Sequence, residues 1–409
     1  MGLSNKCAAR ARSLPAAGGT TRSVPAALMV AVAVALPLAG SASSASAEAP
    51  PARAPASYGR TQLQRDVDAI RSAGATGVLA EVDGGRLVAR SGQAVLASRR
   101  PVPYGSSIRI GSATKSFVAT VVLQLAAEGR LSLDDTVARW LPGVVTGNGN
   151  DGTKITVREL LQHTSGIYDY QNALPWLQTA QGYRAHRFRS AIPRQLVAIA
   201  MRHRPLFPPG TGWSYSSTNY ILLGMIINKV TGQNWAEQVR DRIIVPLGLR
   251  HTFAPGAWPY LPAPHADAYQ QFTPGGPLTD TTVFDPTWAD AAGAIISTPA
   301  DLDRFFRALV TGHLLPPAER AEMETTVATP PGGWSRYGLG LGWQSLPCGG
   351  GYWTHDGDFL GASTIDGVTA DGRRSVVIES FTKQASAQAT AHQHQAEAQL
   401  VDHALCPET

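Results

Sequence analysis

The residues of this chain best suited to do chemistry are Ser112 and Lys115, which stand three positions apart in the run 110–119. Residues at this spacing at the start of a helix lie on the same face, one turn apart. The spacing therefore places an amine beside a hydroxyl, which is what a serine nucleophile needs when no histidine activates it. The pattern predicts an acyl-transfer site, although the motif alone would equally fit a surface serine and lysine.

A second Ser-x-x-Lys, from Ser380 to Lys383, shows how easily chance produces this motif, but the contexts differ. Ser112 precedes an apolar stripe with i, i+3, i+4 spacing that ends at Glu128-Gly129, which predicts an amphipathic helix with a glycine stop. Ser380 instead ends a β-like run over 375–379, from which Lys383 need not face it. We therefore interpret Ser380 and Lys383 as surface residues.

Two other segments carry candidate partners for the serine. The Gly- and Pro-rich run 209–220 leads into an apolar helix and contains Tyr215. This tyrosine could act as a base if a nearby Lys⁺ lowered its pKa from about 10, and otherwise it is a structural loop residue. The run 352–361 contains His355 and then Gly357, and a glycine in a strand lets the backbone approach a substrate closely. An N–H of this strand could complete an oxyanion hole with that of Ser112, although a lone histidine is more often structural.

The signatures of rival chemistries are missing from the sequence. It contains no Gly-x-Ser-x-Gly elbow, no His-Glu-x-x-His and no phosphate-cradling glycine loop. His392 and His394 stand two apart on an expected helix, so their side chains diverge rather than chelate. We therefore expect no metal and no cofactor.

The first 47 residues resemble a secretory signal peptide. Residues 26–39 form an apolar stretch, and Ala45-Ser46-Ala47 is an A-x-A cleavage site. We expect cleavage after Ala47, a Pro/Ala linker over 48–58, a secreted protein and no stable membrane insertion; an uncleaved N-terminal anchor is the alternative. The basic residues that precede the apolar stretch are Lys6, Arg10, Arg12 and Arg22.

Removing that signal changes the charge and the cysteine count. The chain has 35 basic and 30 acidic residues, and without the four basic residues of the signal the net charge falls from +5 to +1. We therefore expect no nucleic-acid partner. Cys7 leaves with the signal, and Cys348 and Cys406 remain. In an exported chain these suggest one disulfide that ties the C-terminus to a strand region, or else two buried free thiols.

Strand signals lie at both ends of the mature chain, and helical signals fill the middle. A helix over 62–73 and a hairpin over 77–90 come first, and a strand over 376–378 and a helix over 385–405 come last. This order predicts one domain over 59–409. Its α/β lobe is built from 59–130 and 285–409, and an α-helical lobe over 131–284 is inserted, with a ligand cleft between the lobes.

Taken in order, Ser112-x-x-Lys115, Tyr215-Ser216-Ser217 and His355-Asp356-Gly357 resemble the serine β-lactamases of the class C type and the secreted DD-peptidases. The likeness is greatest to the secreted actinobacterial D-alanyl-D-alanine carboxypeptidase/transpeptidases and covers roughly 60–406. It implies an α/β (α+β) fold, with an antiparallel sheet flanked by helices and an inserted all-α lobe.

The resemblance also implies a role for each candidate residue. Ser112 would be the nucleophile, Lys115 its activating partner, and Tyr215 the general base and later the acid. His355 would be the fourth catalytic residue and would open the strand that carries Lys-Thr-Gly in β-lactamases. The substrate-binding positions would be Ser217, Trp288, Asp356, Gly357 and Asp358, with the oxyanion hole on the N–H groups of Ser112 and Asp358, and Cys348 and Cys406 would match the single disulfide of the DD-peptidases.

Three departures from the family pattern affect substrate binding. Ser217 replaces an asparagine that holds the acyl side chain, Asp356 and Asp358 replace threonines, and Gly342-Trp343-Gln344 stands where the DD-peptidase has an arginine for the substrate carboxylate. Like charges at about 4 Å cost about 1 kcal/mol in water and several times more in a cleft. An acid with a raised pKa could instead be neutral and donate a hydrogen bond.

The leading prediction is therefore a secreted D-Ala-D-Ala carboxypeptidase that acts on peptidoglycan peptides through an acyl-enzyme. The alternatives are an esterase or D-amino-acid amidase or aminopeptidase on the same site, a β-lactamase, and a non-catalytic peptidoglycan-binding relative. The expected partners are peptides or other small acyl substrates, and β-lactams, and the expected state is a monomer.

Overall fold

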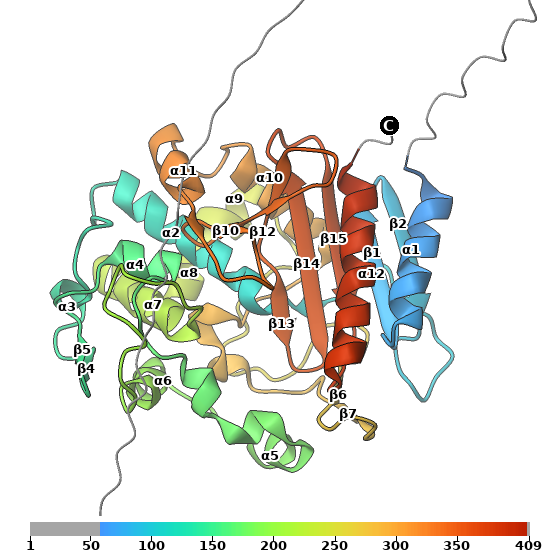
Figure 1. Cartoon of the computed structure of the whole chain (residues 1–409), viewed down its shortest axis with the longest axis horizontal. Helices are drawn as coiled ribbons and strands as arrows, with labels where there is room; N and C mark the ends of the chain where they lie inside the picture. The colour runs from blue at the N-terminus through green and yellow to red at the C-terminus, as the bar shows by residue number, and fades with distance from the viewer. Residues whose placement is uncertain (1–57, 407–409) are drawn as a thin grey trace, which may run out of the picture. The chain divides into compact units, whose positions relative to one another are not determined.

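The computed structural model of the chain describes residues 58–406 (Figure 1). The predicted signal peptide and almost all of the predicted linker lie outside these residues. Within 58–406, no helix is both long enough and apolar enough to cross a membrane.

A nine-stranded antiparallel sheet forms the centre of the described structure, in the order β2-β1-β15-β14-β12-β11-β10-β9, with β13 paired to the start of β14. The predicted hairpin is present as β1 and β2. The strand bounds are β1 (Gly77–Val82), β2 (Leu87–Gly92), β9 (Val327–Ala328), β10 (Arg336–Tyr337), β11 (Gly342–Ser345), β12 (Gly351–Thr354), β13 (Gly357–Phe359), β14 (Ala362–Thr369) and β15 (Ser375–Ser380).

Helices α1 (Arg60–Ser72) and α12 (Ala387–Leu405) lie side by side against one face of this sheet (Figure 1). They form an apolar cluster with alternate residues of the central strands, such as Val78 of β1, as the period-2 alternation of a strand requires. A disulfide between Cys348 and Cys406 ties the end of α12 to the turn between β11 and β12, which agrees with the predicted pairing.

Helices α2 (Thr114–Ala127) and α10 (Pro299–Val310) pack on the other side, where Phe117 stacks on Phe305. The sequence predicted α2 to be amphipathic, but it is buried around almost its whole circumference. The reason is its position, because it packs against α10 and α11 (Pro317–Glu324) and against the helices of the middle segment. Its polar residues Thr114, Lys115 and Ser116 are therefore buried and must find partners inside the protein.

The middle segment is mainly helical but includes two short β-hairpins, whereas the sequence predicted helices alone. The hairpin of β6 (Tyr269–Gln271) and β7 (Leu278–Asp280) pairs with β16 (Thr382–Lys383), and β4 (Thr146–Gly147) pairs with β5 (Asn150–Asp151). The strands β3 (Ile108–Arg109) and β8 (Ile296–Ser297) pair just before the Ser112 segment. The helices are α3 (Val137–Trp140), α4 (Val157–Gln162), α5 (Ala180–His186), α6 (Pro193–Ala200), α7 (Ser217–Thr231), α8 (Trp235–Val239), a π-helical turn (Arg240–Ile244) and α9 (Val245–Leu247).

Candidate active site

Ser112 and Lys115 meet at the start of α2, as their spacing predicts. Ser112 lies in a 3₁₀ turn, Gly111–Ala113, that runs directly into the helix. The Nζ of Lys115 donates to the Oγ of Ser112 at 3.0 Å and to the carbonyl oxygen of Ala292 at 2.7 Å. The backbone acceptor fixes the direction of the amine, so the lysine faces the serine.

Tyr215 completes a three-residue cluster, because its hydroxyl lies 2.7 Å from the Oγ of Ser112. The loop that carries it is held by His163, whose Nδ1 accepts from the N–H of Ser216 at 3.2 Å and whose ring centroid lies 4.4 Å from that of Tyr215. The structure thus brings together the three residues that the motifs singled out. We infer that this constellation suits serine-based acyl transfer.

The buried position of the cluster changes which residue can act as the base. Burial lowers the pKa of Lys115 to about 7, and the nearby Asp169 carboxylate opposes the shift only in part. Burial raises the pKa of Tyr215 well above its usual value near 10, although its hydrogen bond with Ser112 works against the shift. The expectation that Lys⁺ would make Tyr215 the base is therefore not supported, since the lysine itself tends to lose its charge. We infer that Lys115 suits the role of base better than Tyr215, and that Tyr215 suits the role of proton donor.

The backbone segments expected to form the oxyanion hole are in direct contact. Gly111 has a φ of +51°, and a Cβ there would lie 2.4 Å from the carbonyl oxygen of Asp358. At Gly357, an added Cβ would lie 1.9 Å from the carbonyl oxygen of Ile110. Only glycine allows this approach, which brings the backbone of Asp358 beside that of Ser112.

His355 lies away from the reacting atoms, which differs from the catalytic role expected for it. Its ring is buried, and its Nε2 lies 2.9 Å from the hydroxyl of Tyr337. Burial lowers its pKa to about 3, so the imidazole is neutral. Its backbone N–H donates to Asp366 at 3.1 Å. We infer that His355 positions the strand that ends at Gly357.

Ser217 also differs from its expected substrate-binding role. It is the first residue of α7, it is buried, and it does not line the cleft around Ser112. Asp169 accepts a hydrogen bond from its backbone N–H, which anchors the start of the helix. The family's asparagine thus has no counterpart at this position that could reach an acyl group.

The cleft divides into two arms that share Ser112, Gln171 and Asp358. The first, which we call the apolar arm after its aromatic residues, has a volume of about 440 Å³ and contains Trp288, which the resemblance expects in the cleft. Its other walls are polar, because they include the side chains of Gln171, Gln178, Gln270, Gln271 and Gln384. Its aromatic wall is formed by Phe272, Phe284, Trp288 and Phe359. The second, which we call the acidic arm, measures about 540 Å³. It is lined by Asp169, Asp356 and Asp358, with Trp213, Tyr215 and Trp334 as its aromatic residues.

The carboxylates of Asp356 and Asp358 both border the acidic arm, as the sequence predicts. Asp358 is paired with Lys383, whose amine comes from β16 and which the sequence interpretation had assigned to the surface. Lys383 is partly exposed, whereas Ser380 is buried, so the surface interpretation was wrong for Ser380. Nothing in the local sequence shows that β16 pairs with β6 beside the cleft, which is what brings Lys383 to Asp358. Ser380 is not the partner of Lys383; its hydroxyl donates to Glu397 at 2.7 Å.

The environment of Asp356 favours its neutral form. Desolvation and the charge of Asp358 raise the pKa of Asp356 to about 7, while a hydrogen bond from Thr354 at 3.2 Å works in the opposite direction. The side chain is exposed to the cleft, so solvent weakens the desolvation that raises the pKa, and the charge of Asp358 is the firmer cause. Asp356 therefore changes charge close to neutral pH.

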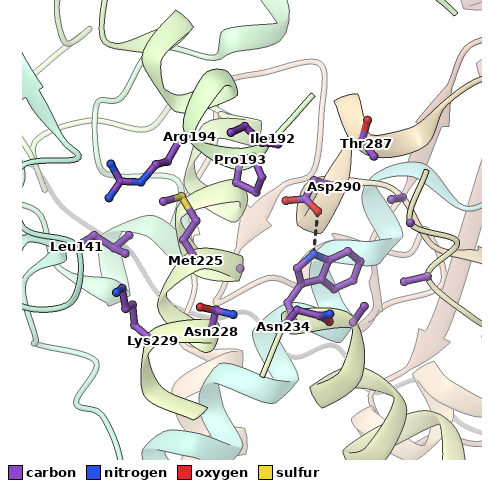
Figure 2. A pocket seen from close by; sticks show the side chains of 16 residues that line it. Leu141, Ile192, Pro193, Arg194, Met225, Asn228, Lys229, Asn234, Thr287 and Asp290 are labelled. Atoms are coloured by element: carbon purple, nitrogen blue, oxygen red, sulfur yellow. Dashed lines mark hydrogen bonds between the residues drawn. The ribbon is translucent and has the colours of Figure 1, made fainter. Parts of the chain in front are cut away.

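A separate hollow of about 460 Å³ lies between α7, α8 and the start of α6 (Figure 2). On its wall, Asp290 accepts a hydrogen bond from the indole N–H of Trp235 at 2.9 Å (Figure 2). None of the catalytic candidates lines this hollow. The hollow is connected to the active site through the backbone. Asp290 begins a 3₁₀ turn that ends at Ala292, and the carbonyl oxygen of Ala292 accepts the hydrogen bond from Lys115.

Sequence reasoning missed several groups that support the site. Asp169 and the Ala292 carbonyl surround Lys115, and His163 supports the Tyr215 loop. A backbone carbonyl leaves no signal in a sequence. His163 stands in His163-Thr164-Ser165-Gly166, a stretch that belongs to the family resemblance but suggested no contact with Tyr215.

Comparison with known proteins agrees with this geometry. The chain is 28% identical over 299 residues to penicillin-binding protein 4* of Bacillus subtilis, which covers 70% of this chain and 63% of that protein. The structure of a D-stereospecific amidohydrolase from Streptomyces sp. is 40% identical and has a TM-score of 0.78, covering 85% of this chain and 99% of that one. The structure of a D-amino acid amidase from Ochrobactrum anthropi SV3 is 26% identical with a TM-score of 0.73, covering 83% and 97%.

The family model described as Beta-lactamase matches residues 63–401, which is most of the described chain. The antiparallel sheet, its flanking helices and the matched structures agree on the same fold. The chain belongs to the Beta-lactamase family of serine hydrolases.

Proposed function

We propose that this protein hydrolyses amides or esters of D-amino acids through an acyl-enzyme on Ser112. The observation that carries the proposal is the charge of the cleft. Neither arm is lined by a lysine or arginine side chain among residues 58–406, and the nearby Lys383 is already paired with Asp358. A substrate that ends in a free carboxylate would therefore lack a partner, whereas an amide or ester brings no such charge.

The D configuration is supported by similarity rather than by geometry. The two structural neighbours described above are a D-stereospecific amidohydrolase and a D-amino acid amidase. The aromatic wall of the apolar arm fits a large apolar side chain on the acyl group, because such side chains gain most from burial against aromatic rings. An aromatic D-amino acid is therefore the acyl group that we propose.

The proposed reaction begins when neutral Lys115 accepts the proton of Ser112 and the Oγ attacks the carbonyl carbon. The oxyanion is held by the N–H groups of Ser112 and Asp358. When the bond to the leaving amine breaks, Tyr215 donates a proton to the amine and recovers one from Lys115. Water then attacks the ester and loses its proton to the same pair. The pair returns this proton to the Oγ of Ser112 as the acid is released.

The proposal is tested by comparing D-phenylalaninamide with its L enantiomer, following ammonia release by the purified residues 48–409. We expect the D form to be cleaved at least about tenfold faster, and Ser112→Ala to reduce the rate by more than about 10³-fold while the circular dichroism spectrum is retained. Equal hydrolysis by folded Ser112→Ala, or no hydrolysis of either enantiomer, would overturn the proposal.

The second candidate is D-Ala-D-Ala carboxypeptidase activity, which the sequence analysis placed first. The observation in its favour is the similarity to penicillin-binding protein 4*, and the chain matches only 63% of that protein. Release of D-alanine from a peptide that ends in D-Ala-D-Ala, faster than ammonia from D-phenylalaninamide, would make this the preferred function.

We also propose that the protein is secreted after cleavage behind Ala47. The disulfide between Cys348 and Cys406 supports this, because such bonds persist in oxidising compartments. Edman sequencing of protein from the culture medium should begin at Glu48, and retention of the whole chain inside the cell would contradict the proposal.

A further inference from the structure

The position of Tyr215 shows which arm of the cleft must receive the leaving group. Its hydroxyl lies 2.7 Å from the Oγ of Ser112 and lines the acidic arm, but not the apolar arm. A proton donor must be within hydrogen-bond reach of the leaving amine. We therefore place the leaving amine in the acidic arm and the acyl side chain in the apolar arm.

The charges around the acidic arm do not balance. Its three carboxylates belong to Asp169, Asp356 and Asp358. Asp358 is paired with the cation of Lys383. Asp169 lies near Lys115, whose pKa is lowered to about 7, so this neighbour is largely neutral above that pH. Asp356 accepts one hydrogen bond from the hydroxyl of Thr354 and has no cationic partner among the ion pairs of the described residues. When Asp356 is ionised, the arm therefore carries at least one uncompensated negative charge.

The walls of the same arm are suited to a cation. Trp213, Tyr215 and Trp334 line it, and the rings of Tyr215 and Trp334 are 6.1 Å apart. Aromatic faces attract ammonium groups within about 6 Å, and the attraction adds to that of a carboxylate. A carboxylate on the leaving group would instead face both Asp356 and the electron-rich rings.

We propose that the acidic arm selects leaving amines that carry a second, positively charged group and rejects those that carry a carboxylate, with Asp356 as the specificity-determining residue. Suitable substrates are D-aminoacyl amides of diamines or of basic residues whose own carboxyl group is blocked. This inference rests on the proposed D-amino-acid amidase function and deepens it. It also explains the departures at Asp356 and Asp358, which would hinder a peptide that ends in a free carboxylate.

The test uses three D-phenylalanine amides whose leaving amines are similar in length. The amines are 1,3-diaminopropane, butylamine and β-alanine, which carry a positive charge, no charge and a negative charge at pH 8. The initial rate at which each amine is released, measured over a range of substrate concentrations, gives kcat/KM for each amide. We expect a decrease of about fivefold to tenfold at each step from cation to neutral to anion, as for unit charges close together in a partly solvated cleft.

Asp356→Asn removes the charge with little change in shape and should bring the three values to within about threefold of one another. The matched control is Asp134→Asn, which makes the same change in net charge at an exposed residue outside the cleft and should keep the wild-type order. A wild-type order that persists in Asp356→Asn would overturn the inference.

A measurement on the wild type keeps the inference testable if Asp356→Asn does not fold. In 1 M NaCl the screening length falls to about 3 Å, so the differences between the three substrates should shrink. Equal kcat/KM values for the three amides at low salt, with D-phenylalaninamide still hydrolysed, would overturn this inference and leave the proposed function intact. If D-phenylalaninamide is not hydrolysed either, the proposed function fails and the inference fails with it.

Discussion

The amine of Lys383 and the carboxylate of Asp358 form an ion pair at the edge of the cleft, next to the backbone that reaches Ser112. The pair brings a cation to the edge of the cleft, but that cation is already neutralised by Asp358. The sequence lacked the arginine that the DD-peptidases use for the substrate carboxylate. A positive charge is nevertheless present near the cleft, on Lys383, and it is neutralised by Asp358.

Replacing Asp358 with threonine should free Lys383 to bind a carboxylate and increase acylation by benzylpenicillin by about tenfold. Intact mass spectrometry of the protein, with the adduct mapped to Ser112, measures the rate. The double variant Asp358→Thr/Lys383→Met is the control, because it lacks both charges and should lose the gain. If the single and double variants react equally fast, Lys383 is not the relevant cation.

The activity should rise with pH through about 7, because Lys115 must be neutral to accept the serine proton and its pKa is lowered to about 7 by burial. A profile of kcat/KM between pH 5 and 9 for D-phenylalaninamide checks this. Lys115→Arg stays protonated throughout and should lose more than about 10³-fold of the activity. A profile that is flat from pH 5 to 9 would show that a different group is the base.

The same buried lysine should reduce stability at neutral pH. Its folded pKa lies below its unfolded value near 10.5, so the penalty is absent above pH 10.5, grows as the pH falls, and is complete below about 7. Lys115→Met removes it and should raise the free energy of unfolding at pH 7, on the order of a few kcal/mol. Urea denaturation at pH 7 measures the change, and a less stable variant would contradict the argument.

The sequence predicted the reacting cluster better than its surroundings. The pairing of Ser112 with Lys115 follows from helix spacing, which is local, and Tyr215 was recognised because its motif is short and continuous. Lys383 could not be placed, because its approach to Asp358 depends on the parallel pairing of β16 with β6, more than a hundred residues away. His355 stands at the position that the family resemblance indicates, but its side chain does not line the cleft and is hydrogen-bonded to Tyr337 instead.

The fold shows the same division between local and long-range signals. The first helix, the hairpin and the final helix were predicted from their periodicity, with boundaries within two residues for the helices. The full burial of α2 was not predicted from the sequence. Polar residues such as Thr114 and Lys115 indicate a solvent-exposed helix face unless their buried partners are known. Long-range packing decides these cases.

The buried carboxyl groups of Glu379 on β15 and Glu81 on β1 should make the protein more stable in mild acid than at pH 8. Burial raises the pKa of Glu379 well above its usual value and that of Glu81 to about 7, and both side-chain oxygens of Glu379 are buried without a hydrogen-bond partner among the described residues. Groups with a raised folded pKa contribute most stability below their unfolded pKa of about 4.5 and lose it as the pH rises.

Glu379→Gln should therefore raise the melting temperature at pH 8 and change it little at pH 5. The matched control, Asp134→Asn, removes an equal charge from an exposed position and should have little effect at either pH. Thermal unfolding at the two pH values measures the difference. A destabilised Glu379→Gln at pH 8 would mean that the ionised carboxylate has a partner.

Gly357 lies so close to the backbone of Ile110 that a Cβ on it would lie 1.9 Å from the carbonyl oxygen of Ile110. Backbone atoms cannot yield as a flexible side chain can, so Gly357→Ala should push β13 away from the Ser112 turn and separate the two oxyanion N–H groups. We expect a loss of about 10²-fold or more in kcat for D-phenylalaninamide. Gly333→Ala is the control, since Gly333 lines the acidic arm but has open space where a Cβ would be added. A fully active Gly357→Ala would show that the oxyanion does not depend on this contact.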